Sequence, residues 1–426
     1  RVFNPDYEQH GWHSNHTVIQ IHNVDVPFLV DSIRMELNRR ELAILSVNNC
    51  VLACERTKTH KLKKVKPAKE RDENSQMESM IYLEIERHSD PQLLDELRDS
   101  LLSVLTDVKA VVDDFVPIKE KALEVKEELR GRDANSPEIK ETRKLLDWLL
   151  DDNFIFQGYE EVVVSQNEGK VFTDAVDGTQ LGTQRKASVH AELSQLEQQF
   201  VLAEKLAMFS KDVQRSTVHR PVYRDLIIIK RFDESGGVIG ECRFFGLYTS
   251  SVFLTNPLRI PVVRQKLIGI LSECGFEPGG HSHKALVQII TDMPREELIL
   301  AETSDLKRTS FGIFNMQERR RACLFVRQDS SKRIYSCLYY IPRDLYTTKL
   351  RNTVLHLLYK GLHGRDYEAN SQISESILSR THFVIYSDPD QQAEVDIATI
   401  EARILDVSRS WDDDLNVSLI DAYGEE

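Results

Sequence analysis

The 426-residue sequence lacks the short motifs that mark most catalytic sites. It contains no GxxxxGKS/T phosphate loop, no GxSxG nucleophile elbow and no HExxH zinc helix. A glycine pattern from Ser235 to Gly240 joins two expected strands, whereas a dinucleotide-binding loop must join a strand to a helix. We therefore expect no catalytic residues and no cofactor site within this chain.

Long apolar runs and paired cysteines are also missing. No segment approaches the roughly 20 apolar residues that cross a bilayer, and the N-terminus lacks the charged-then-apolar layout of a secretory signal. Six cysteines without a CxxC pair are few for this length, so we expect reduced thiols. These features predict a cytoplasmic protein with no membrane partner.

The charge balance argues against nucleic acid as a partner. The formal net charge is −13, whereas phosphate binding needs a concentrated basic field. One basic run, Lys58 to Lys69, is expected to be a solvated loop between strands. With 41% hydrophobic and 29% charged residues, the chain should form two to four globular domains.

Residues 16 to 47 predict a strand, a loop, a helix and a second strand. Val18 to His22 alternate between apolar and polar side chains, as a half-buried strand does. Pro27 suits the first position of a helix, where its missing N–H costs nothing. Alternation returns from Ala43 to Val47. The helix should turn one apolar stripe toward a core, namely Leu29, Val30, Ile33 and Leu37.

This unit extends into a ferredoxin-like sandwich over residues 1–115. Met80 to Ile85 alternate as a third strand, and Pro91 opens a long amphipathic helix. The order β-α-β-β-α is that of a ferredoxin-like fold, with no final strand evident after Val112.

Histidines gather in two places without the other ligands that a metal site needs. His10, His13 and His16 recur every third position, but glycine and asparagine between them weaken a helix. His281 and His283 lie in an expected loop with no further ligand in view. We therefore expect no metal site.

The rest of the chain predicts alternating sheet and helical units. We expect a helix around Leu193 to Met208, a hairpin turning at residues 235–237, and a strand over Ala285 to Ile290 between two helices. The fold class is α+β, with two ferredoxin-like sandwiches flanking a mixed-sheet domain. The predicted units are a first sandwich at 1–115, a helical connector at 116–150, a mixed sheet at 151–256, a helix-strand-helix connector at 257–312, a second α/β sandwich at 313–412, and the start of a following unit at 413–426, where residues 416–420 resemble a strand.

The loop before the first helix resembles the ligand loop of ACT domains, which often bind amino acids. The resemblance lies in an Asp two residues before Pro27 and in the apolar residues after it. It implies that Asp25 could hold an amino group while N–H groups past the proline hold a carboxylate. Phe28 stands near the position where such loops usually carry glycine, so the loop could equally be a packing unit with a closed pocket. The candidate ligand residues are Asn23, Asp25, Pro27, Phe28 and Leu29.

Two further sets of residues are weaker candidates. The run Arg319, Arg320 and Arg321 could bind an acidic ligand or a neighbouring subunit, or could be exposed arginines leading a strand. Arg243 and Tyr248 could line a pocket in the middle sheet or could pack its surface.

Several long segments together resemble the N-terminal part of the large bacterial NAD-dependent glutamate dehydrogenases. The resemblance implies ACT-like sandwiches around a PAS-like sheet domain, which agrees with the units above. The segments are NVDVPFLVDSIRMELNRR (23–40), WLLDDNFIFQGYEE (148–161), the stretch from 218 to 250, GFEPGGHSHKAL (275–286), and two stretches at 314–329 and 334–351.

This resemblance implies a parent enzyme that deaminates L-glutamate to 2-oxoglutarate and ammonium with NAD as the hydride acceptor. The catalytic core would lie elsewhere in the same polypeptide, so this chain would hold no cofactor of its own. The resemblance further implies that the chain assembles a homo-oligomer and responds to a small effector, an amino acid, as ACT domains do. Two alternatives stay open: a self-contained amino-acid sensor that acts on a separate partner, and an enzyme in its own right.

Overall fold

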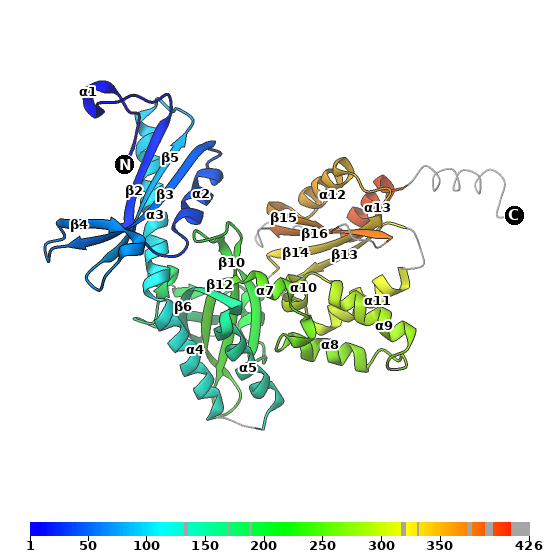
Figure 1. Cartoon of the computed structure of the whole chain (residues 1–426). Helices are drawn as coiled ribbons and strands as arrows, with labels where there is room; N and C mark the ends of the chain where they lie inside the picture. Colours follow the sequence, from blue (N-terminus) through cyan, green and yellow to red (C-terminus); the bar gives the residue numbers. More distant parts are fainter. Residues whose placement is uncertain are drawn as a thin grey trace.

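Three antiparallel sheets follow one another along the chain in the computed structural model. The structure describes residues 1–131, 135–167, 170–186, 190–316, 321–329, 332–372, 377–387 and 395–409. Figure 1 shows the first sheet in blue, the middle sheet in green, and the third in orange beside a group of yellow-green helices. Within the described part of the chain, no helix is long and apolar enough to cross a membrane.

The first module packs two helices against a five-stranded sheet of order β1-β2-β5-β3-β4. Ile19 and Leu83 from the sheet meet Ile33 and Leu97 from the helices, and all four side chains are fully buried. The apolar stripes predicted for both helices thus form the core. The elements are β1 (Val2–Phe3), α1 (Tyr7–His10), β2 (Thr17–Val24), α2 (Leu29–Arg39), β3 (Ile44–Arg56), β4 (Leu62–Pro67), η1 (Ala68–Glu70), β5 (Gln76–Ile85) and α3 (Pro91–Asp113).

The edge of this sheet explains the missing final strand. In a ferredoxin-like sheet, a fourth strand lies beside the first, which is β2 in this module. Here the short strand β1 takes that place, with Val2 opposite Ile19 and Phe3 opposite Val18. The sheet is therefore completed by the N-terminal residues, and not by a segment after α3.

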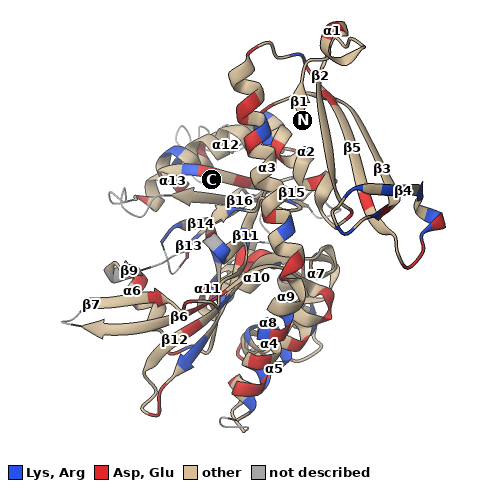
Figure 2. Cartoon of the chain, turned by 90° about the vertical axis from the view of Figure 1, so that its left-hand side faces the viewer, with Lys and Arg blue, Asp and Glu red and all other residues tan. Residues whose placement is uncertain are grey.

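Three local predictions for this module were wrong. Helix α2 begins at Leu29, two residues after the proline that should have opened it. The basic run contains strand β4, which lies at the edge of the first sheet (Figure 2), although its lysines are mostly exposed. A register shift between Ile44 and Ser46 leaves Leu45 exposed, contrary to the predicted alternation. By contrast, α1 ends at the left-handed Gly11, so the three N-terminal histidines do not share a helix face, as the glycine between them indicated.

A buried carboxylate links the strands beneath this basic edge. Glu78 on β5 is 3% exposed and accepts a hydrogen bond from Nη2 of Arg56 on β3 at 2.7 Å and contacts Nε2 of His22 on β2 at 2.5 Å. Hydrogen bonding from Arg56, against the cost of burial, lowers the pKa of Glu78 to about 2. The charged form therefore stabilises the fold.

This pKa predicts acid sensitivity with a defined sign. The folded pKa lies below the ordinary value, so the stabilisation is present above about pH 4.5 and is lost as the pH falls toward 2. We expect the urea midpoint to fall between pH 5 and pH 3, and Glu78→Gln to flatten that fall while lowering stability at pH 7. The exposed Glu73→Gln serves as the control and should follow the unmodified chain. An unchanged pH profile in Glu78→Gln would contradict this assignment.

The middle module has an antiparallel sheet, and not the predicted mixed one, of order β10-β11-β12-β6-β7-β9, with β8 pairing β6. The predicted hairpin is confirmed, because β11 and β12 pair antiparallel across residues 233–237. The predicted helix around 193–208 is too long, since β10 already begins at Ala207. The elements are α4 (Phe115–Arg130), α5 (Pro137–Trp148), η2 (Leu149–Asn153), β6 (Phe154–Asn167), β7 (Lys170–Ala175), β8 (Leu181–Gly182), η3 (Thr183–Lys186), β9 (His190–Glu192), α6 (Gln195–Val201), β10 (Ala207–Arg215), β11 (Tyr223–Phe232), β12 (Val238–Tyr248) and α7 (Ser250–Leu254).

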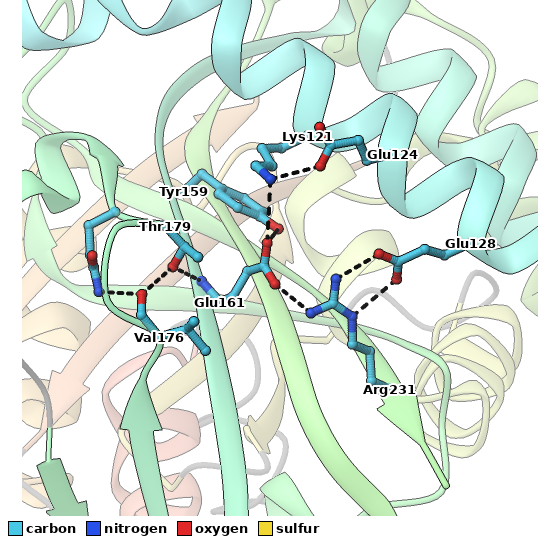
Figure 3. A network of polar contacts seen from close by, with 9 residues as sticks. Lys121, Glu124, Glu128, Tyr159, Glu161, Val176, Thr179 and Arg231 are labelled. Carbon is cyan, nitrogen blue, oxygen red and sulfur yellow. Dashed lines mark hydrogen bonds and ion pairs between the residues drawn. The ribbon is translucent and has the colours of Figure 1, made fainter. Parts of the chain in front are cut away.

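A polar network fastens α4 to this sheet (Figure 3). Arg231 on β11 lies 2.5 Å from Oε2 of Glu161 on β6 and 2.9 Å from Oε1 of Glu128 on α4. Tyr159 donates a hydrogen bond to Oε1 of the same Glu161 at 3.0 Å. One arginine thus joins two strands and a helix through two carboxylates.

A helical segment and a third sheet complete the described chain. The predicted strand at 285–290 is wrong, because these residues lie in α9, whose Leu286, Ile289 and Ile290 form a buried helical face. The third sheet has the order β13-β14-β16-β15, so its N-terminal strand again takes the edge beside the first ferredoxin-like strand. The elements are η4 (Pro257–Arg259), α8 (Val263–Ser272), α9 (His281–Asp292), α10 (Arg295–Leu300), α11 (Thr303–Met316), β13 (Cys323–Gln328), β14 (Ile334–Pro342), α12 (Thr348–Gly361), β15 (Gly364–Gln372), β16 (Leu378–Ser387) and α13 (Ile397–Val407).

The third sheet is covered on both faces. Tyr339 and Phe383 pack toward α12 and α13, whereas Leu338 and Tyr340 pack into a core shared with the helical segment and the middle sheet. The helical segment is therefore the layer that joins the second and third sheets. The strand predicted at residues 416–420 and the unit predicted from 413 lie outside the described residues.

Candidate functional site

The predicted ligand loop leads from β2 into α2. Oδ1 of Asn23 accepts a hydrogen bond from the N–H of Val24 at 2.9 Å, so this side chain is turned back on its own backbone. Asp25 and Pro27 are exposed, and Leu29 is buried in the core of the first module. The loop therefore brings one exposed carboxylate close to a helix N-terminus.

Phe28 takes an unusual conformation at the start of α2. Its φ of 69° lies in the left-handed region, where glycine is favoured, which agrees with the glycine of ACT loops. Its ring packs 5.1 Å from the ring of His219, measured between centroids. Phe28 therefore connects the ligand loop to the middle module.

His219 belongs to the connection between β10 and β11, residues 215–222, which we call the junction loop. Val218 in this loop is fully buried and belongs to the core of the first module. Its carbonyl accepts hydrogen bonds from Nε2 of Gln157 at 3.0 Å and from the hydroxyl of Ser216 at 2.7 Å. One loop of the middle module thus supplies part of the core of another.

Polar contacts surround the buried Val218. The N–H of His219 donates to the buried hydroxyl of Ser32 on α2 at 3.1 Å, and its Nδ1 lies 3.5 Å from Asp31. Thr217 donates to Asp107 on α3 at 2.9 Å. Both helices of the first module therefore touch the junction loop.

The other side of the junction meets the third module. Arg215 and Tyr223 both donate to Oδ2 of Asp366 on β15, each at 2.8 Å. Burial and this carboxylate raise the pKa of Tyr223 to about 12, and its ring stacks on Tyr386 at 3.7 Å between centroids. The junction loop and its flanking strands thus contact all three sheets.

A buried cation lies next to this junction. Lys211 on β10 is 4% exposed, and its Nζ lies 2.8 Å from Oδ1 of Asp225 and 3.1 Å from Oε1 of Glu296 on α10. Although burial opposes its charge, the two carboxylates raise the pKa of Lys211 well above the ordinary value. The lysine is therefore charged, and it ties the middle sheet to the helical segment.

The neighbouring carboxylate on α10 points into the third sheet. Glu297 receives two hydrogen bonds from Arg327 at 2.7 and 2.8 Å and one from the hydroxyl of Ser336 at 2.6 Å. Ser336 also contacts Nε2 of His382 at 2.8 Å, and burial lowers the pKa of this histidine. Adjacent glutamates of one short helix thus hold different modules.

Two other buried amines are structural. Lys230 donates to the carbonyls of Phe200, Val201 and Ala203 at the end of α6. Burial lowers the pKa of Lys230 to about 8, and Lys266, which reaches carbonyls at the end of α10, is lowered likewise. These lysines stabilise helix C-termini, so their perturbed pKa values do not mark catalysis.

The structure separates the two candidates of the middle sheet. Arg243 lies beside Glu160 and lines a cavity of about 560 Å³, together with the side chains of Arg224 and Phe245. Tyr248 is buried on the opposite side, where its ring packs against Phe154. The arginine therefore lines a pocket, whereas the tyrosine packs in the core.

The arginine run before β13 is described only in part. Arg321 is exposed, while Arg319 and Arg320 lie outside the described residues. Among the described residues, no group of three or more His, Cys, Asp or Glu side chains could hold a metal ion.

Sequence reasoning missed the junction loop. Residues 218–222 of this loop enter the sequence analysis only within a segment that carries the family resemblance, and neither Val218 nor Lys211 carries a local signal of its role. A lysine within an apolar strand, as in Ala207 to Arg215, is the one pattern that could have pointed to a buried ion pair.

Comparisons with known proteins agree with this modular organisation. Three family models match in order: the glutamate dehydrogenase ACT1 domain over residues 1–101, helical motif 1 over 260–319, and the ACT2 domain over 323–412. They confirm that the two outer modules are similar to ACT domains.

Curated relatives extend the similarity across the chain. The NAD-specific glutamate dehydrogenase of Halomonas elongata is 38% identical over 435 residues, which cover 100% of this chain and 27% of that protein. The Pseudomonas aeruginosa protein of the same name is 37% identical over 432 residues, with the same coverage. The Mycobacterium tuberculosis protein of that name is 26% identical over 403 residues, covering 91% of this chain and 24% of that protein. The chain thus spans about a quarter of the length of the relatives that it matches.

Proposed function

Because this chain belongs to the family of NAD-specific glutamate dehydrogenases, we propose that it is the N-terminal regulatory and assembly region of such an enzyme. The parent enzyme would convert L-glutamate, NAD and water to 2-oxoglutarate, ammonium and NADH. Its catalytic and NAD-binding parts would lie elsewhere in the same polypeptide. The observation that carries the proposal is that the whole of this chain matches about a quarter of the length of enzymes that bear that name.

The junction loop supports a regulatory role. It contacts α2 and α3 of the first module, and its first residue, Arg215, binds Asp366 of the third. A ligand that binds two arrangements of these modules unequally would shift their populations, whereas equal binding would shift nothing. The proposed effector is an amino acid at the loop formed by Asn23, Asp25, Pro27, Phe28 and Leu29.

Finer points of the proposal concern the middle sheet and assembly. We propose that residues 151–256 form a PAS-like domain, supported by a single antiparallel sheet against which α4 packs. The parent would be a homo-oligomer in the cytoplasm, and the arginine run at 319–321 is a candidate contact between subunits. The whole chain is similar to part of a longer dehydrogenase, which favours a regulatory region of such an enzyme over a self-contained sensor.

Thermal unfolding with a panel of amino acids and dicarboxylates tests the effector site. A ligand that binds only the folded state stabilises it by RT ln(1 + [L]/Kd), or about 2.7 kcal/mol at 100 times Kd. We expect one amino acid to raise the melting temperature and Asp25→Ala to abolish the rise, whereas the exposed control Asp177→Ala keeps it. If no amino acid has an effect, the ligand loop is not a regulatory site.

A second assay tests whether this chain lacks the catalytic activity proposed for the parent enzyme. This chain alone should show no glutamate-dependent formation of NADH. Activity above background, retained after repurification, would contradict the proposal.

A further inference from the structure

A groove lies at the point where the three modules meet. Its cavity of about 820 Å³ is lined by α2, by the junction loop and by β15. Four of the lining side chains are arginines: Arg34 and Arg39 from α2, and Arg215 and Arg220 from the junction loop. We call this cavity the junction groove.

Two of these arginines are neutralised within the protein. Arg39 forms a pair of 2.7 Å hydrogen bonds with Glu36, and Arg215 binds Asp366 at 2.8 Å. Their charges are therefore matched by carboxylates that also line the groove.

The other two arginines have no such match. The side chain of Arg34 on α2 is exposed and makes no hydrogen bond or ion pair with any described residue. Arg220 donates through Nη2 to the carbonyl of Tyr248 at 2.6 Å, but no described carboxylate lies within ion-pair distance of it. Its Nε is buried and has no hydrogen-bond partner in the described structure.

The acidic groups around the groove limit what could bind there. Asp31 lies 3.5 Å from Nδ1 of His219, and the pKa of Glu296 is lowered chiefly by Lys211 and to a smaller extent by Arg220. A long polyanion such as a nucleic acid would extend past Arg34 and Arg220 onto Asp31, which no arginine of the groove neutralises, and it would be repelled there. A small anion avoids that repulsion and gains charge-assisted hydrogen bonds from guanidinium groups.

We propose that the junction groove binds a small oxyanion, a carboxylate or a phosphate, between Arg34 and Arg220. This second site is separate from the loop at residues 23–29, and its regulatory meaning rests on the function proposed above. Because Arg34 and Arg220 belong to different modules, a shared anion would favour the arrangement in which they face one another. The anion would thus stabilise the docking of the first module on the middle one.

Thermal unfolding of this chain in succinate, in inorganic phosphate and in sodium chloride at equal ionic strength tests the proposal. We expect succinate, phosphate or both to raise the melting temperature by about 2–4 °C in a saturable manner, relative to chloride. Arg34→Gln should weaken the apparent affinity about tenfold, since it removes one charge-assisted contact. Arg34 is exposed and unbonded, so this variant should fold normally.

Two comparisons make the outcome decisive. Arg403→Gln, an exposed arginine on α13, serves as the matched control and should leave the shift unchanged. Asp25→Ala should also keep it, so failure of the amino-acid site and failure of this site can be told apart. If neither succinate nor phosphate exceeds chloride, or if Arg34→Gln responds like Arg403→Gln, the proposal is overturned. The relative sizes of the succinate and phosphate shifts identify the type of oxyanion.

Discussion

Replacing Lys211 with methionine should lower the free energy of unfolding by about 3–5 kcal/mol. The lysine is 4% exposed and lies between Asp225 and Glu296, which face one another once the ammonium is removed. Without the cation, the buried carboxylate of Asp225 and the partly buried one of Glu296 must either repel each other or take up a proton, and both outcomes cost free energy. Urea unfolding followed by tryptophan fluorescence would measure the loss.

A control and a suppressor separate this cause from general damage. Lys205→Met removes a lysine that is half exposed and pairs with Glu302, so it should cost less than about 1 kcal/mol. Adding Glu296→Gln to Lys211→Met should restore part of the stability, because it removes one of the stranded charges. A Lys211→Met protein as stable as the Lys205→Met protein would show that the buried cluster contributes little.

Replacing Gly182 with alanine should cost about 2–5 kcal/mol. Its φ of 61° lies in the left-handed region, which costs a residue with a side chain roughly 1–2 kcal/mol. In addition, a Cβ here would stand 2.2 Å from the carbonyl oxygen of Gln157, and relieving such a clash typically costs about 1–3 kcal/mol. The N–H of Gly182 donates to Asp114 at 2.6 Å, so moving this backbone would also disturb the end of α3.

Gly178 offers a matched control four residues away. Its φ of 80° is equally left-handed, but a Cβ there would meet no atom within 4 Å. Gly178→Ala should therefore lower the free energy of unfolding only by the cost of the left-handed backbone, about 1–2 kcal/mol. The urea midpoints of both variants would be compared at constant m-value. Equal losses at the two positions would mean that the contact with Gln157 is easily relieved.

The parts of the fold that follow from local sequence were largely predictable. The period of Leu29, Ile33 and Leu37 identified the buried face of α2, and the turn at residues 235–237 located a hairpin. Errors arose where tertiary contacts decide between a helix and a strand. Residues 285–290 are apolar enough for either a strand or a helix, and the helix prevails because Leu286, Ile289 and Ile290 face neighbouring helices.

The candidate site was harder to predict because its parts are distant in sequence. Arg215 and Asp366 are 151 positions apart, and His219 and Ser32 are 187 apart. Such pairs leave no periodic signal, whereas the ligand loop at Asp25 is contiguous and could be noticed. Phe28 illustrates both cases: its place in the loop was evident, but its left-handed backbone and its contact with His219 were not.

The position of Val218 has a consequence for synthesis on the ribosome. The other buried members of its core end at Val111, so more than a hundred residues must still be added before that core can close. At about 5–20 residues per second, this delay is roughly 5–20 s. During that interval the nascent first module exposes an apolar gap where Val218 will later lie, and it is then a natural client for chaperones that meet growing chains.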